Sequence, residues 1–89
     1  MELDINQILQ QAVTQHNQGK FEEAANLYLT ILKIESTHLD AIHNLGVALQ
    51  ALGRLAEAEL IYNKAIVLKP NFAIAHHSLS VLLYKLGRL

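Results

Sequence analysis

The sequence predicts an all-α protein, an α-solenoid of antiparallel helix hairpins with five helices. Three observations support this prediction: an internal repeat, apolar residues spaced three and four positions apart, and no alternating pattern typical of a strand. The repeat is clearest at Gly19, Gly53 and Gly87, which follow one another at steps of 34 residues (53 − 19 and 87 − 53). Each of these glycines is followed by a cation and then an apolar residue. A unit is therefore a helix, a glycine turn and, where the chain continues, a second helix.

The apolar spacing places the helices at residues 5–18, 21–34, 39–52, 55–68 and 72–86. We expect the repeated glycines to adopt the left-handed backbone that ends the first helix of each unit. Asp4 with Gln7, and Thr37 with Asp40, are the candidate capping pairs at the starts of the first and third helices.

The chain is predicted to form a single domain over residues 1–89, divided into units 5–38, 39–72 and a truncated unit 73–89. No run rich in proline, serine or charge marks a linker between them. The third unit reaches its turn at Gly87 and has no residues left for a second helix. We therefore expect the N-terminal fragment of a longer protein, with a complete short protein as the alternative.

Composition argues against several classes of function. Lys and Arg number 7 against 8 Asp and Glu, a net charge of −1. A nucleic-acid-binding domain is usually clearly basic because it neutralises phosphates, so we expect no nucleic-acid partner. The chain has no cysteine, which excludes disulfides and thiolate chemistry. It has no signal-peptide pattern and no apolar run near the ~20 residues that cross a bilayer, so we expect a cytoplasmic protein without a membrane partner.

The repeating unit resembles the tetratricopeptide repeat, a family of helical hairpins with the same period. The second unit matches the signature of that family at Ile42, Leu45-Gly46, Leu49, Ala58, Tyr62, Ala65 and Pro70. The first unit departs from it at Gln11, Gln15 and Ser36, as a terminal repeat is expected to do because one of its faces meets solvent. The resemblance covers about the whole chain. It implies a scaffold for protein or peptide partners, and no enzyme activity within this segment.

In tetratricopeptide repeats the first helices of successive units line a concave groove, which the resemblance makes the candidate peptide site. The groove candidates are Asn6, Leu9, Val13, His16 and Asn17 in the first unit, Asp40, His43, Asn44, Val47, Gln50 and Ala51 in the second, and Ile74, His77, Ser78, Val81, Tyr84 and Lys85 in the third. This set mixes apolar and polar side chains and carries little positive charge.

Two ligand classes of similar arrays can be compared with these residues. A clamp for a terminal carboxylate needs cations to offset the desolvation of the anion. Only Asn44 matches such a clamp, so we reject that ligand class. A ladder of asparagines that holds an extended peptide, as in the arrays ahead of O-linked N-acetylglucosamine transferases, would run through Gln10, Asn44 and Ser78. Peptide binding with Asn44 in the site is therefore a hypothesis.

The last helix carries a stripe of leucines that no later helix of the chain covers: Leu79, Leu82, Leu83 and Leu86. Fully burying one leucine is worth ~1.5–3 kcal/mol, so four exposed leucines would be a liability. We expect the isolated chain to associate through these residues into a homodimer or a higher homo-oligomer.

The sequence predicts no catalytic, cofactor-binding or metal site. It contains no phosphate loop, nucleophile elbow or metalloprotease pair. Of its five histidines, His43 and His77 lie one period apart, too far to share one metal ion, which leaves zinc at a contact between copies as the alternative. The leading hypothesis is a protein-interaction scaffold. The alternative is an N-terminal substrate-recruiting or oligomerisation module of a larger enzyme, such as a glycosyltransferase or other transferase.

Overall fold

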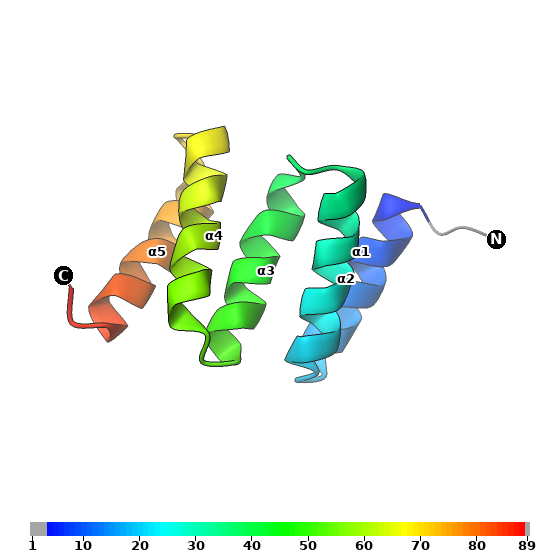
Figure 1. Ribbon diagram of the computed structural model, residues 1–89, viewed down its shortest axis with the longest axis horizontal. Coiled ribbons are helices and arrows are strands. Elements are labelled where there is room, and N and C mark those ends of the chain that lie inside the picture. The colour runs from blue at the N-terminus through cyan, green and yellow to red at the C-terminus, as the bar shows by residue number, and fades with distance from the viewer. Residues whose placement is uncertain (1–3, 89) are drawn as a thin grey trace.

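The computed structural model describes residues 4–88, which form five α-helices joined by short turns (Figure 1). The helices are α1 (Ile5–Asn17), α2 (Phe21–Ile34), α3 (Leu39–Ala51), α4 (Leu55–Leu68) and α5 (Ala73–Lys85). The predicted all-α fold of five helices is confirmed; α2 and α4 have the predicted bounds, and the others are shorter by one residue at one or both ends. The division into units stays a prediction. Its range of 1–89 includes residues 1–3 and 89, which lie outside the described residues.

A glycine follows the first helix of each unit, as predicted. Gly19, Gly53 and Gly87 have φ angles of 78°, 78° and 72°, a left-handed backbone that other residues adopt only with strain. In the first hairpin the N–H of Lys20 donates to the carbonyl oxygen of Gln15 at 2.9 Å, a bond typical of a Schellman turn. The same bond recurs at the other two glycines, so the turns share one geometry.

One of the two predicted capping pairs is present. The carboxylate of Asp4 accepts the N–H of Gln7 at 2.8 Å, and the Gln7 side chain accepts the N–H of Asp4 at 3.0 Å. The predicted pair of Thr37 and Asp40 is wrong. The cap of α3 is His38, whose Nδ1 accepts a backbone N–H from three residues later at 3.1 Å. Its ring nitrogen takes the place of the usual oxygen, and α3 therefore begins at the following residue.

The helices pack on one another in chain order, and α3 also touches α5. Seen down the shortest axis, α2 and α4 lie in front of α1 and α5 (Figure 1). We call the surface formed by α2 and α4 the outer face, and the surface formed by α1, α3 and α5 the inner face. The described residues measure 47 × 27 × 17 Å, so the array is a thin slab with these two broad faces.

Two tyrosines fill the space between paired helices. Tyr28 and Tyr62 are the largest fully buried side chains, each with 1% of its surface exposed. A Cβ added to Gly46 would lie 2.5 Å from Cε1 of Tyr62, closer than any real contact. Ala12, one period before Gly46, is also fully buried. In the second hairpin the helices can therefore approach closely because a glycine faces a ring.

The structure corrects the expectation for the leucine stripe of α5. Leu82 has 0% of its surface exposed, and Leu79 and Leu86 are half-buried and pack against the core. Leu83 is also half-buried. The expectation that the chain leaves all four leucines uncovered is wrong, because α4 packs against this side of α5.

Part of the uncovered surface of α5 is polar instead. His76 and Ser80 are exposed, whereas Ile42 and Gly46, one period earlier, are buried beneath α4. Among the described residues, this side of α5 thus carries hydrophilic side chains at positions where α3 has an isoleucine and a glycine.

We predict that Gly46→Ala destabilises the protein by about 1–2 kcal/mol. The new methyl group must displace a ring that is itself fully buried, and this cost exceeds the gain in helix propensity of about 1 kcal/mol. Urea unfolding followed by circular dichroism measures the change. Ser80→Ala, at the same repeat position on the open helix, is the control and should stay within about 0.5 kcal/mol of wild type. A Gly46→Ala variant as stable as wild type would contradict the close approach.

Candidate functional site

Most of the predicted groove residues line one of two hollows on the inner face. One hollow, of about 410 Å³, lies between α3 and α5 and is lined by Val47, Gln50, Ala51, Tyr62, His77, Ser78, Val81 and Lys85. The other, of about 430 Å³, follows α1 and is lined by Asp4, Asn6, Gln7, Leu9, Gln10, Val13 and Thr14. The structure therefore brings most of the predicted residues of the second and third units together, and keeps those of the first unit apart from them.

Several predicted groove residues line neither hollow. Asp40 is exposed at the start of α3, and Tyr84 and Ile74 project from α5 with 75% and 50% of their surfaces exposed. Asn17 is exposed at the end of α1, and His16 is half-buried against Phe21 and Tyr28.

His43 is the buried polar residue of the inner face, with 7% of its surface exposed. Its Nε2 lies 2.8 Å from Oγ of Ser78 on α5, and its Nδ1 lies 3.4 Å from Oδ1 of Asn44. Its ring packs near those of Tyr62 and Phe72, at centroid distances of 5.8 and 6.2 Å. His43 thus joins the second unit to the third. This contact fixes the position of the Ser78 hydroxyl, while His43 itself presents little surface to a ligand.

Burial lowers the pKa of His43 below its ordinary value of 6.5, because the charged ring loses solvation. The hydrogen bond with Asn44 and the negative charge of Asp40 raise the pKa, but both effects are smaller than that of burial. The neutral ring is therefore the form that bonds to Ser78 near neutral pH. Burial lowers the pKa of His16 in the same way.

Tyr62 forms part of the hollow between α3 and α5. Its hydroxyl donates to Oε1 of Gln50 at 2.9 Å, and burial raises the pKa of Tyr62 to about 12, so the hydroxyl stays protonated. This bond holds the amide oxygen of Gln50 toward Tyr62. Tyr62 was not among the groove residues predicted from the sequence. The sequence signal for this contact is the spacing of twelve residues between Gln50 and Tyr62. The same spacing separates His16 from Tyr28, whose hydroxyl lies 3.4 Å from Nδ1 of His16.

The chemistry of the hollow suits recognition. Val47 and Val81 supply apolar walls, Gln50 and Ser78 supply oriented polar groups, and Lys85 is its cation. Within residues 4–88, no three His, Asp or Glu side chains could together hold a metal ion. Over the same range, no helix has both the length and the apolar character that a bilayer span requires.

A third hollow, of about 240 Å³, lies on the outer face between α2 and α4, where no site was predicted from the sequence. Its rim includes Leu29 and Leu60, with 45% and 70% of their surfaces exposed. Both leucines lie off the buried stripes of their helices, which run through Tyr28 and Tyr62. Apolar residues that lie outside the buried stripe of a helix were therefore the sequence signal for this hollow.

The packing of paired helices and the groove between first helices define a helical-repeat interaction array. A comparison with family models matches residues 15–83 to the tetratricopeptide repeat. The chain therefore belongs to the tetratricopeptide repeat family, as the resemblance implied. A search of curated proteins gives no match.

Solved structures share this fold. SycD, the type III secretion translocator chaperone of Yersinia enterocolitica, has a TM-score of 0.92 at 21% identity, covering 96% of this chain and 63% of that chain. A second SycD structure, described as an alternative dimer, has a TM-score of 0.91 at 21% identity, with coverages of 96% and 64%. MamA of AMB-1 has a TM-score of 0.84 at 25% identity, with coverages of 96% and 50%. The chain thus spans between half and two thirds of the length of these proteins.

We predict that the free energy of unfolding falls as the pH is lowered through and below 6.5. The unfolded chain binds protons at its histidines near pH 6.5, whereas folded His43 and His16 bind them only at lower pH. Their stabilising effect is therefore fully present above pH 6.5 and is lost as the pH falls through the folded pKa values. Urea unfolding at about pH 7.5 and about pH 5 measures the loss.

His43→Gln isolates the contribution of His43, because glutamine keeps a hydrogen-bonding group and does not titrate. The variant should lose less stability than wild type between the two pH values, while His16 still contributes in both proteins. Parallel pH profiles of the variant and wild type would contradict the role given to His43.

Proposed function

We propose that the protein is an interaction scaffold that binds an extended peptide segment of a protein partner in the hollow between α3 and α5. One observation carries this proposal: the polar groups of the hollow are already oriented by buried partners. Ser78 is bonded to His43, and Gln50 accepts from Tyr62. Orienting these groups before binding lowers the entropic cost of binding. Membership of the tetratricopeptide repeat family supports a protein or peptide as the partner. The oriented side chains of Ser78 and Gln50 support the hollow between α3 and α5 as the binding site.

The second candidate is that this array recruits substrates to, or assembles, a larger enzyme such as a glycosyltransferase or other transferase. The line through Gln10, Asn44 and Ser78 supports it, because it resembles the asparagine ladder of arrays that precede such enzymes. The second candidate uses more of the inner face, because Gln10 lines the hollow along α1 and Ser78 lines the hollow between α3 and α5. For both we propose the cytoplasm as the compartment, a location that fits the cysteine-free composition.

We also propose that the isolated chain forms a homodimer or a higher homo-oligomer through α5. Leu83 is half-buried, whereas Leu49, one period earlier, is 5% exposed beneath neighbouring helices. Leu79 and Leu86 add their half-buried edges to the same surface. Leu82, which the sequence placed in this contact, supports the surface from inside the core.

We predict that random peptides selected from a phage library on the immobilised protein bind in the groove. Val81→Glu places a charge on an apolar wall of the hollow. It should weaken peptide binding about tenfold or more, because binding would then bury an unpaired charge against the apolar side chains of the peptide. Asn44→Ala should weaken it less. Leu60→Glu, on the opposite face, is the control and should leave the affinity unchanged. Isothermal titration measures all three, and peptides indifferent to Val81→Glu would count against the groove.

We predict that Leu83→Glu shifts the isolated chain toward smaller species at micromolar concentration, because a buried glutamate would be left unpaired in the α5 contact. Light scattering coupled to size-exclusion chromatography measures the mass. Thr14→Glu, on α1, is the control and should leave the mass unchanged. If wild type and Leu83→Glu have the same mass, α5 is not the contact.

A further inference from the structure

We propose that the outer face binds an amphipathic helix of another protein, which lies in the hollow between α2 and α4 and runs antiparallel to both. The helix carries a large apolar side chain that enters the hollow, and acidic side chains toward its N-terminus. This site goes beyond the peptide groove, because it lies on the opposite face of the array. Three features support it: an apolar hollow, two lysines at one end of that hollow, and the direction of the flanking helices.

The hollow supplies the apolar part of the site. Leu45 and Leu49 of α3 belong to its lining and are themselves buried, and the small side chain of Ala25 leaves room beside them. Leu29 and Leu60 border the hollow with 45% and 70% of their surfaces exposed. A volume of about 240 Å³ has room for one large apolar side chain. A helix that inserts such a side chain would also cover the two exposed leucines.

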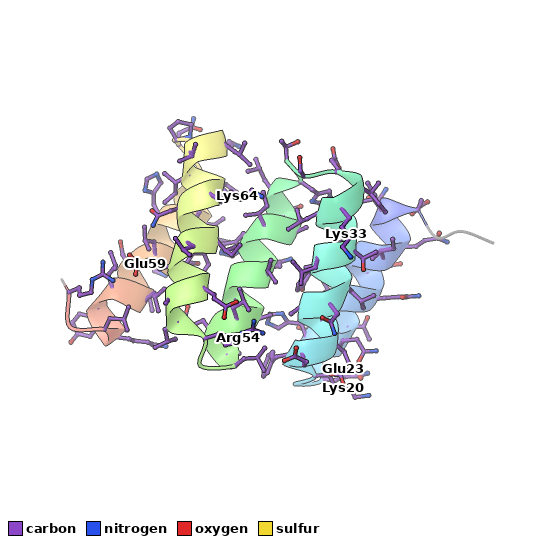
Figure 2. The ribbon with its side chains drawn as sticks, viewed as in Figure 1. Lys20, Glu23, Lys33, Arg54, Glu59 and Lys64 are labelled. Atoms are coloured by element: carbon purple, nitrogen blue, oxygen red, sulfur yellow. The ribbon has the colours of Figure 1, made fainter. Side chains whose placement is uncertain are left out.

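Two lysines continue the borders of the hollow toward one end. Lys33 follows Leu29 by four residues on α2, and Lys64 occupies the same place after Leu60 on α4. Residues four apart lie on the same face of a helix, so both lysines flank the path of a helix bound in the hollow. Figure 2 shows them toward the same end of the outer face. Among the described residues, neither lysine forms an ion pair. Carboxylates of a partner can therefore pair with both without breaking an existing contact.

The charges at the other end of the hollow are already paired. Arg54 donates to both carboxylate oxygens of Glu57, at 3.0 and 2.8 Å, and lies 4.0 Å from the carboxylate of Glu22. Lys20 and Glu23, at the start of α2, add one charge of each sign. This end therefore has one more carboxylate than cations and repels acidic side chains. The two ends of the site thus differ in charge, which gives a bound helix a preferred direction.

The flanking helices favour the same direction. α2 and α4 run parallel in Figure 1, and both lysines lie toward their C-terminal ends. A helix carries partial negative charge at its C-terminus and partial positive charge at its N-terminus, so an antiparallel partner places opposite partial charges together. Acidic side chains also stabilise the first turn of the partner helix itself. On the inner side, α3 already packs against both α2 and α4 in the antiparallel direction.

Distances along the helices predict the spacing of the partner's side chains. The hollow is lined by residues 22–29 of α2 and 54–61 of α4, spans centred at 25.5 and 57.5. Lys33 lies 7.5 residues beyond the first centre, and Lys64 lies 6.5 residues beyond the second. This separation is about 10 Å, or two helical turns. In an antiparallel helix the acidic residues therefore precede the apolar residue by about seven positions, which keeps them on one face.

A second copy of this chain does not fill the hollow in a closed dimer. A two-fold axis that joins two outer faces with antiparallel helices places α2 on α2 and α4 on α4, so no helix of the second copy enters the hollow between them. An axis that places α2 on α4 keeps the helices parallel and brings the lysine ends of both copies together. The occupant is therefore a helix of a different protein.

A synthetic peptide tests the site. The probe is an alanine-rich peptide of about 20 residues, long enough to form a helix. It carries two leucines four residues apart and two adjacent glutamates, which lie seven and eight residues before the second leucine. Fluorescence anisotropy with the full chain should give a dissociation constant of tens to hundreds of micromolar, because a single helix buries a small area. Leu60→Glu should weaken this binding at least tenfold. A peptide that does not bind, or whose binding is indifferent to Leu60→Glu, would overturn the proposal.

Charge reversal tests the role of the lysines. Lys33→Glu combined with Lys64→Glu should weaken binding at least tenfold, and a peptide with lysines in place of its glutamates should bind this double variant more tightly than it binds wild type. Lys20→Glu, which makes the same type of charge change at the other end of α2, is the matched control and should change the affinity less than twofold. Added salt should weaken the original complex. Equal effects of Lys20→Glu and of either lysine reversal would mean that the peptide senses only net charge, and the proposed site would be wrong.

Two further measurements test the direction and the occupant. A peptide with the same composition but with its glutamates after the leucines should bind at least fivefold more weakly, and equal binding of the two peptides would contradict the antiparallel direction. Sedimentation equilibrium of the chain alone, with and without Leu60→Glu, tests for a second copy. The variant should leave the mass unchanged; if it dissociates an assembly, the outer face binds another copy of this chain and the proposal fails. Leu60 is exposed, so circular dichroism should show unchanged folding of the variant.

Discussion

The contact of Gly46 with the ring of Tyr62 is the constraint on which this structure depends. Because position 46 carries no side chain, α3 and α4 approach until the ring fills the space between them. The same ring then extends to the inner face, where its hydroxyl orients Gln50. Packing within this hairpin and the orientation of Gln50 on its inner face therefore depend on one side chain. A change that loosens the hairpin also releases a polar group of the groove.

His43 shows how a polar residue becomes part of this packing. It is buried against Tyr62 and Phe72, and it bonds across to Ser78 of the next unit. Among the described residues, no buried side-chain nitrogen or oxygen lacks a hydrogen-bond partner. Burial without unpaired groups makes the junction between the second and third units specific, because a shift of α5 along α3 would break the bond and leave both atoms unpaired.

The fold could be predicted because a 34-residue period, repeated glycines and helical spacing are all local properties of the sequence. Details that depend on neighbours in space were harder. Thr37 and His38 are both plausible caps, and only the backbone decides between them. Leu82 looked uncovered in sequence, yet it lies against the core beside α4. The groove was predicted as a face, but Asp40 and Tyr84 fall outside its hollows. The outer hollow depends on Ala25 and Leu29 of α2 together with Leu60 of α4, so the sequence of one helix alone does not predict it.

The chain-order packing of the helices has a consequence for motion. A helix inside the array is held from both sides, whereas α5 is held by α4 and, more lightly, by α3. In such a one-dimensional stack, fluctuations begin at the ends, so amide protons of α5 should exchange with solvent before those of α3. One wall of the groove, with Ser78 and Val81, belongs to this least anchored helix. A segment bound between α3 and α5 would therefore also add contacts that hold α5 in place.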